Sequence, residues 1–301
     1  MKKTLFLFCA LIFNWASFSE GAFEERYWGA RVSGLGGAYG IISDDAAGVF
    51  YNVAKLGSSQ GKQLEFGYGQ LFTGVSGVSL SVSNFGYAHP LKTGVLGIGW
   101  GSFGAKDLYR EDVIVLGYGL DLRKLFNGLD REIDLGISTR VLMRRFILDQ
   151  RTVGDPVFKD GRVNSNMAID LHFYTALNEV MPGFGAGLSL KSLNKPTIGF
   201  VEKEQLLPEI VASVGWKGKK WTVPFDLSHQ ETLTPHFGLE RKMMDERVIL
   251  RAGSDLSQVG SGFGYRHKLQ TVEISLDYSF IWPIHFQKGS GSHRTSLGLK
   301  F

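Results

Sequence analysis

The chain has one cysteine, Cys9, among its 301 residues. Because Cys9 lies in an apolar leader, the rest of the chain cannot form a disulfide framework, a thiolate metal site or a cysteine nucleophile. The sequence also lacks an apolar run of the about 20 residues that a membrane-spanning helix needs. Together with a mean hydropathy of −0.02, this argues against a helical membrane protein.

A large charge excess is missing as well. The formal net charge is +4, too small and too scattered to predict a nucleic-acid partner, and anionic lipopolysaccharide is an easier partner. The seven histidines lack the spacing of metal ligands, so we predict neither a metal site nor a cofactor. Ser228 and His229 would face opposite sides of a strand, so we predict no enzyme.

The first residues have the pattern of a secretory signal peptide. Lys2 and Lys3 precede a short apolar run over residues 5–13, and small residues follow up to Gly21. Cys9 lies too early in this run for a lipoprotein signal. The pattern therefore predicts a signal peptide over residues 1–21.

The last residues alternate and end on an aromatic side chain. Leu297, Leu299 and Phe301 would share one face of a terminal strand. This ending resembles the signal that the barrel-assembly machinery reads on the final strand of outer-membrane barrels. We therefore predict that these residues form a barrel-assembly signal, that this machinery is a partner, and that the protein is located in the bacterial outer membrane.

Alternation of apolar and polar residues is the dominant pattern from Gln63 onward. Fourteen segments carry apolar residues at spacing two, and two of them are weak, so twelve strands stay possible. In the second segment, the apolar set that ends at Val82 is expected to face outward. Pro224 would interrupt a later strand as a bulge or a weak seam. The pattern predicts an all-β transmembrane antiparallel β-barrel of about 14 strands over residues 63–301.

A soluble β-sandwich would alternate in the same way. Aromatic residues near the expected strand ends and connections of unequal length favour the barrel. Long connections are expected over residues 145–162, 192–207 and 281–293, and short turns at 217–219 and 267–268. Outer-membrane barrels have this asymmetry, with long external loops and short periplasmic turns.

Residues 22–62 do not alternate. Ser43 can cap a short helix with Asp44 and Asp45 in its first turn, and Gly57 would end it. A barrel of about 14 strands leaves a lumen that its own side chains do not fill. We therefore predict that this stretch is a hatch (plug) inside the barrel with one short helix; an extension outside the barrel is the alternative.

The N-terminal stretch resembles one family of outer-membrane proteins. Residues 29–38 read GARVSGLGGA, residues 44–46 read DDA, and residues 51–56 read YNVAKL. These motifs are similar to those of the FadL-like outer-membrane barrels, including the PorV/PorQ branch associated with type IX secretion. Val53 stands where the family has a proline. The resemblance implies a fourteen-stranded barrel, an N-terminal hatch and, for the FadL members, uptake of hydrophobic small molecules such as long-chain fatty acids.

Glycines occupy the expected lumen-facing positions of two adjoining strands, which leaves either room for the hatch or a ligand track. The residues expected at the hatch and along the ligand path are Gly36, Gly37, Asp44, Asp45, Asn52, Gly97, Gly99, Gly101, Gly117 and Gly119. We predict passive uptake of hydrophobic or amphipathic molecules. The alternative is a PorV/PorQ-like protein that binds secreted cargo or secretion machinery and transports nothing itself.

Overall fold

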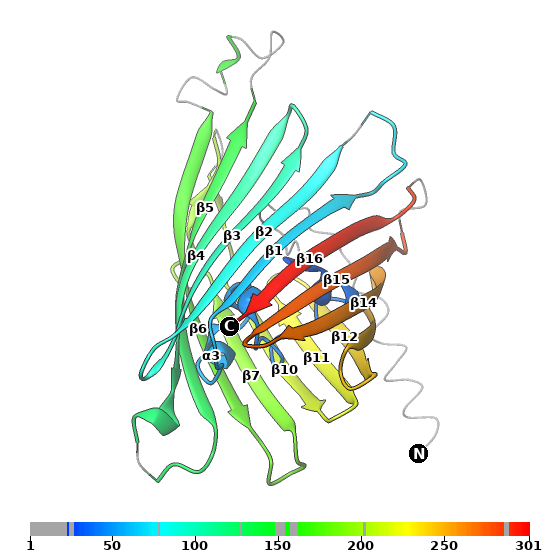
Figure 1. Ribbon diagram of the computed structural model, residues 1–301. Helices are drawn as coiled ribbons and strands as arrows, with labels where there is room; N and C mark the ends of the chain where they lie inside the picture. The colour runs from blue at the N-terminus through cyan, green and yellow to red at the C-terminus, as the bar shows by residue number, and fades with distance from the viewer. Residues whose placement is uncertain are drawn as a thin grey trace, which may run out of the picture.

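The computed structural model describes residues 23, 27–77, 79–126, 128–147, 154–156, 162–200, 203–285 and 289–301. The predicted signal peptide lies outside these residues. The chain folds into a closed antiparallel barrel of 14 strands, which confirms the prediction of a fourteen-stranded all-β barrel (Figure 1). Neighbours in sequence are neighbours in the wall, except that β7 pairs directly with β10.

The wall strands are β1 (Gln63–Leu71), β2 (Leu80–Pro90), β3 (Gly94–Ala105), β4 (Tyr109–Asp121), β5 (Ile133–Phe146), β6 (Val163–Ala176), β7 (Phe184–Lys191), β10 (Glu209–Lys217), β11 (Trp221–His229), β12 (Leu233–Met243), β13 (Val248–Ser254), β14 (Gln258–Leu269), β15 (Val272–Pro283) and β16 (Ser292–Lys300). The elements outside the wall are α2 (Ala30–Gly34), η1 (Ala46–Phe50), α3 (Val53–Leu56), η2 (Leu122–Lys124), β8 (Thr197–Ile198) and β9 (Glu204–Gln205).

The barrel closes between its first and last strands. The β1–β16 ladder runs from Gln63↔Lys300 to Gln70↔His293. It is extended by backbone hydrogen bonds from Lys62 N to Phe301 O (2.7 Å) and from Phe301 N to Lys62 O (3.0 Å). Closure pairs both edges of the sheet, so no open edge strand remains at the seam.

The outer surface of the wall is apolar. Large hydrophobic side chains at alternate strand positions are exposed, among them Phe66, Ile98, Leu116, Ile137, Leu250 and Leu276. Their strand neighbours face inward and are small or polar, as expected for strands between lipid and lumen. A closed 14-stranded barrel with this surface resembles bacterial outer-membrane proteins and fits the outer membrane. None of the helices in the described part of the chain is long and apolar enough to cross a bilayer.

The prediction of which side chains of β2 face outward was wrong by one position. Val82 is 3% exposed and packs inside the barrel in a cluster with Leu71 and Phe103. The outward positions are instead those of Phe85 and the residues at spacing two from it. Phe85 pairs directly with Phe66 of β1, and their rings are 5.2 Å apart. This cross-strand aromatic pair fixes the face of β2.

Pro224 interrupts β11 without a bulge. The β11–β12 ladder pairs Thr222 with Glu240 and resumes at Phe225↔Phe237 in the same register. The two intervening pairs are missing from the ladder, because proline cannot donate a hydrogen bond. The structure therefore shows no bulge at Pro224. It shows a local gap in the ladder between β11 and β12.

The two ends of the barrel differ. The long connections expected after β5, β7 and β15 lie at one end, here named the loop end, and the opposite end, where Phe301 lies, is named the turn end (Figure 1). The prediction of short turns alone at the turn end was wrong at one place, because the β4–β5 connection, residues 122–132 with η2, is long. The β14–β15 turn is at residues 270–271, three positions after the expected 267–268, because β14 continues to Leu269. In outer-membrane barrels the long loops are external.

The loop between β7 and β10 covers an edge of the wall. The β6–β7 ladder begins only at Leu171↔Leu190, so the first half of β6 has no partner strand on that side. Leu193 N donates to Ile169 O (3.0 Å), and Asn194 bonds the backbone of Ile169 and Met167 (2.9 and 2.7 Å). The loop therefore satisfies backbone groups that would otherwise form an open edge.

Candidate functional site

The N-terminal segment, defined as residues 27–62, lies inside the barrel. Its apolar side chains are almost fully buried, among them Leu35, Tyr39, Ile42, Val49, Val53 and Leu56. Burying each such side chain contributes roughly 1.5–3 kcal/mol. The helices α2 and α3 contact opposite parts of the wall, α2 against β13 to β16 and α3 against β3 to β6. The segment thus spans the lumen and packs on its inner surface.

The helix prediction for this segment was wrong in detail. Two short helices, η1 and α3, replace the single expected helix, and α2 was not predicted. Ser43 donates to Tyr39 O (2.7 Å) and caps no helix. The cap of α3 is Asn52, whose Oδ1 accepts from Ala54 N (3.1 Å). Gly57 follows the last residue of α3, as expected.

Asn52 also fixes the segment to the wall. Its side-chain Nδ2 donates to Gly40 O (3.1 Å) and to Phe173 O of β6 (3.2 Å). The residue is completely buried. Both functional groups of the amide are therefore used, so Asn52 joins two parts of the segment to one strand.

The predicted lumen-facing glycines touch the segment. A Cβ at Gly99 would lie 2.8 Å from Val49 and Phe50, and one at Gly117 would lie 2.9 Å from Val53. The same close approach occurs at Gly97, Gly101 and Gly119, which face Val49, Trp28 and the backbone of Val53. These positions thus provide the room that lets the segment pack against the wall; a role in a ligand path stays a prediction.

A side chain at Gly36 or Gly37 would be strained for two reasons. Both have positive φ angles, +63° and +86°, which favour glycine. A Cβ at Gly36 would lie 2.2 Å from Ser254 N, and one at Gly37 would lie 2.5 Å from the Tyr27 ring. These two glycines allow the chain to turn sharply and to pass close to β13 and to Tyr27.

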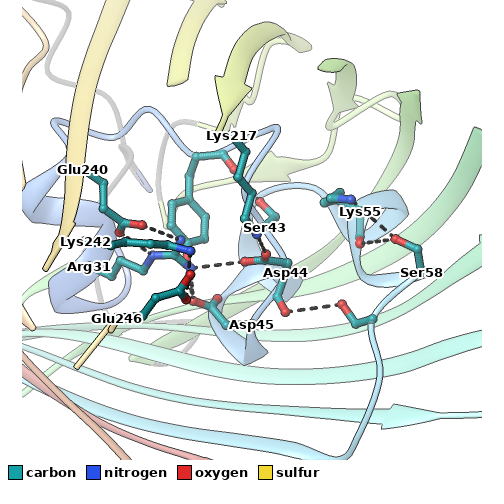
Figure 2. Close-up of polar contacts among 12 residues, drawn as sticks. Arg31, Ser43, Asp44, Asp45, Lys55, Ser58, Lys217, Glu240, Lys242 and Glu246 are labelled. Atoms are coloured by element: carbon teal, nitrogen blue, oxygen red, sulfur yellow. Dashed lines mark hydrogen bonds and ion pairs between the residues drawn. The ribbon is translucent and has the colours of Figure 1, made fainter. Parts of the chain in front are cut away.

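A buried ion network joins the segment to β12, β13 and β15. Figure 2 shows Arg31 pointing to Glu240 on one side and to Asp44 and Asp45 on the other. The nitrogen–oxygen distances are 3.2 Å to Glu240, 3.2 Å to Asp44 and 2.9 Å to Asp45. Glu240 also accepts from Arg251 (2.8 Å), which in turn bonds Asp277 (2.6 Å).

The two aspartates of the expected helix turn belong to this network. Asp44 bonds Lys217 of β10 in addition to Arg31. Burial opposes ionisation of Asp44, but the charges of Lys217 and Arg31 outweigh it and hold its pKa well below the usual range. Asp45 accepts a hydrogen bond from Tyr39 OH. Both carboxylates therefore act as ion-pair partners rather than as helix caps.

A cavity of about 390 Å³ lies between the segment and the loops of the loop end. One wall carries aromatic and aliphatic side chains of the segment and of β4 and β5, among them Trp28, Phe50, Val113 and Leu142. The other wall carries polar side chains, among them Lys191, Glu209, Ser228, His236 and Asp255. The cavity is thus amphipathic, and its lining comes from parts of the chain that are far apart in sequence.

His236 lies where the cavity meets the segment. Its Nε2 is 3.1 Å from Ser228 Oγ, and its Nδ1 is 3.0 Å from Gly36 O and 3.3 Å from Tyr27 OH. Sequence reasoning missed this contact because it considered Ser228 only with the adjacent His229. The pairing of β11 with β12, which places Ser228 opposite Thr234, was not readable from the sequence. No group of three metal-ligating side chains occurs among the residues that the structure describes.

Three solved structures of similar shape are two of TodX and one of a FadL homologue. A deltaS2 mutant of the TodX monoaromatic hydrocarbon channel gives a TM-score of 0.58 at 12% identity, over 90% of this chain and 97% of that one. A FadL homologue of Pseudomonas aeruginosa gives 0.58 at 10% identity over 90% and 97%. The P. putida toluene transporter TodX gives 0.51 at 13% identity over 90% and 96%.

These similarities show the fold. The chain shares its barrel architecture with TodX and with the FadL homologue, and TodX is described as a hydrocarbon channel and toluene transporter. No protein-family model matches the sequence, and a comparison with curated proteins finds no match.

Proposed function

We propose that this chain is a passive outer-membrane channel for hydrophobic or amphipathic small molecules. The observation that carries this proposal is the amphipathic cavity of about 390 Å³, which lies toward the loop end and is bounded on its other side by the N-terminal segment. Its mixed lining suits an amphipathic molecule, because the aromatic and aliphatic side chains can pack on an apolar body and the polar side chains can bind a head group. The likeness to the TodX monoaromatic hydrocarbon channel agrees with it.

In this proposal the N-terminal segment is a hatch. A ligand enters between the external loops, occupies the cavity and leaves toward the periplasm when the segment shifts. Five residues of the segment would control this step through its turns, its ion pairs and its helix cap: Gly36, Gly37, Asp44, Asp45 and Asn52. The wall glycines opposite the segment would line the path that opens: Gly97, Gly99, Gly101, Gly117 and Gly119.

A reversible disulfide tests the hatch. A Cβ at Gly97 would lie 3.4 Å from Val49 Cβ, close to the about 3.5–4.5 Å that a disulfide requires. The double variant Val49→Cys/Gly97→Cys should abolish the barrel-dependent part of toluene uptake into lipopolysaccharide-containing vesicles, measured against vesicles without the barrel, when oxidised and restore it when reduced. Each single variant is the matched control. Equal uptake in the oxidised and reduced forms would show that the segment does not gate a path.

A second function is the PorV/PorQ-like one, in which the barrel binds secreted proteins or a secretion machine. The buried ion pairs of Arg31 favour it, since a segment held in this way leaves no open path. Cross-linking of a defined secreted cargo to the external loops, abolished when a short Gly-Ser linker replaces residues 194–205, would support it. A barrel that transports toluene and cross-links to no cargo would rule it out.

A further inference from the structure

Among the described residues that line the cavity at the loop end, acidic side chains outnumber those of lysine and arginine. The basic ones are Arg140 and Lys191, and the acidic ones are Glu111, Glu204, Glu209, Glu231 and Asp255. Arg140 binds both carboxylate oxygens of Asp170, at 2.6 and 2.9 Å. Lys191 lies 3.2 Å from Glu209. Both cationic groups are therefore already bound to carboxylates of the wall.

Asp255 is a buried carboxylate of this set whose hydrogen-bond donors are all uncharged. It is 5% exposed and accepts hydrogen bonds from Tyr27 OH, from Ser257 and from Gln258. All of these donors are uncharged, and within the described ranges Asp255 forms no ion pair with lysine or arginine. A carboxylate in a site of low dielectric constant without a cationic partner attracts a positive charge more strongly than it would in water.

Aromatic rings surround the same cavity. They belong to the N-terminal part of the chain: Phe23, Tyr27, Trp28, Phe50 and Tyr51. The rings of Trp28 and Phe50 are 5.8 Å apart and tilted by 40°, so the two rings form one aromatic wall. The face of an aromatic ring attracts cations, and such walls bind quaternary ammonium groups.

We propose, on the basis of the transport function above, that the cavity selects organic ammonium ions with an apolar body and disfavours carboxylates. The ammonium group lies near Asp255 and the ring of Tyr27, whose hydroxyl bonds that carboxylate, and the apolar body extends across the cavity to Trp28, Val113 and Leu142. A carboxylate such as a free fatty acid anion meets an excess of negative charge and two cations that already have partners. This reverses the charge of the fatty-acid-like substrate that the sequence resemblance implies.

The test is a series of ligands with one chain length and three charges. The purified barrel in a nonionic detergent is titrated calorimetrically with octyltrimethylammonium, 1-octanol and octanoate. The ammonium ligand is expected to bind at least about tenfold more tightly than octanoate, with octanol between them. The difference should shrink at about 0.5 M salt, because salt screens the charges.

Two variants locate the effect. Asp255→Asn should reduce the preference for the ammonium ligand at least about threefold, whereas the control Asp245→Asn, in the exposed β12–β13 turn, should leave it unchanged. Trp28→Leu removes apolar contact area from the opposite wall and should weaken octyltrimethylammonium and octanol to a similar degree. Heat-modifiable migration checks that each variant folds, and the series on the unaltered protein decides the question if Asp255→Asn does not fold.

The outcomes separate this inference from the function on which it rests. Octanoate binding that equals or exceeds that of the ammonium ligand overturns the charge preference and leaves the channel proposal intact. No binding of any of the three ligands overturns both. A preference that Asp255→Asn leaves unchanged in a folded barrel overturns the assignment to this carboxylate.

Discussion

The guanidinium of Arg31 and the carboxylate of Glu240 meet 3.2 Å apart inside the lumen, where neither has significant contact with solvent. Arg31 belongs to the N-terminal segment and Glu240 to the wall strand β12. Two opposite charges withdrawn from water are stable only while both are present. This ion pair therefore joins the N-terminal segment to the wall, so breaking it should destabilise both.

Removing Arg31 should destabilise the barrel strongly. In Arg31→Ala, Glu240 keeps Arg251 but loses one of its two cations, and Asp45 loses its cationic partner. Removing one partner of a buried pair costs about 3–5 kcal/mol. Chemical unfolding in detergent measures the loss. The control is Arg131→Ala, which removes an exposed pair with Glu179 and should leave the unfolding midpoint where it is; equal effects of the two variants would contradict the role of the network.

Acid should loosen the N-terminal segment. The folded-state pKa of Asp44 lies well below the usual value near 3.9, so its contribution to stability is complete above about pH 4 and is lost as the pH falls through the folded-state pKa. The protection of the amides of residues 30–56 against hydrogen exchange, relative to the intrinsic rate at each pH, should therefore fall below about pH 4. Asp44→Asn should lower this protection at neutral pH and make it respond less to acid. Protection that stays constant down to pH 2 in the unaltered protein would show that Asp44 does not hold the segment.

Two alanine substitutions on β3 should differ in their effect. A Cβ at Gly99 meets Val49 and Phe50 at 2.8 Å, whereas one at Gly104 has its nearest neighbour at 3.7 Å. Overpacking at Gly99→Ala should cost about 1–3 kcal/mol and raise protease access to the segment. Gly104→Ala should change neither. The bulkier Gly99→Trp would displace the segment, so a loss of uptake in that variant cannot by itself demonstrate a ligand track.

Phe301 should matter for assembly more than for stability. Its side chain is 46% exposed, and its backbone alone forms the two hydrogen bonds to Lys62. Phe301→Ser should therefore lower the amount of barrel inserted in cells while the refolded protein keeps its unfolding midpoint. Cell fractionation and detergent unfolding measure the two quantities. Unchanged insertion would remove Phe301 from the predicted assembly signal.

The barrel could be predicted from the sequence because lipid imposes one rule on every strand. An apolar residue must recur at every second position, and side chains such as Ile137 and Leu250 follow this rule. The rule failed at β2 because Val82 is apolar and yet faces inward, where the N-terminal segment makes the lumen apolar as well. Alternation alone cannot distinguish the faces of a strand when both are apolar.

The arrangement inside the barrel was less predictable. Asp44 and Asp45 look like the first turn of a helix in the sequence, but their side chains bind Arg31. The short helix η1 begins just after them, and the α-helical turn α3 begins only at Val53, where Asn52 provides the cap. The cavity could not be predicted, since its lining depends on which loops fold over the lumen. Local patterns carry no information about contacts such as that between Gly36 and His236.

The hydrogen bonds between Lys62 and Phe301 join the start of β1 to the end of β16. β1 follows the N-terminal segment directly and pairs with the last strand, so the ring can close only when the whole chain is present. The segment continues directly into β1, so the seam that closes the ring is also the place where the segment enters the lumen.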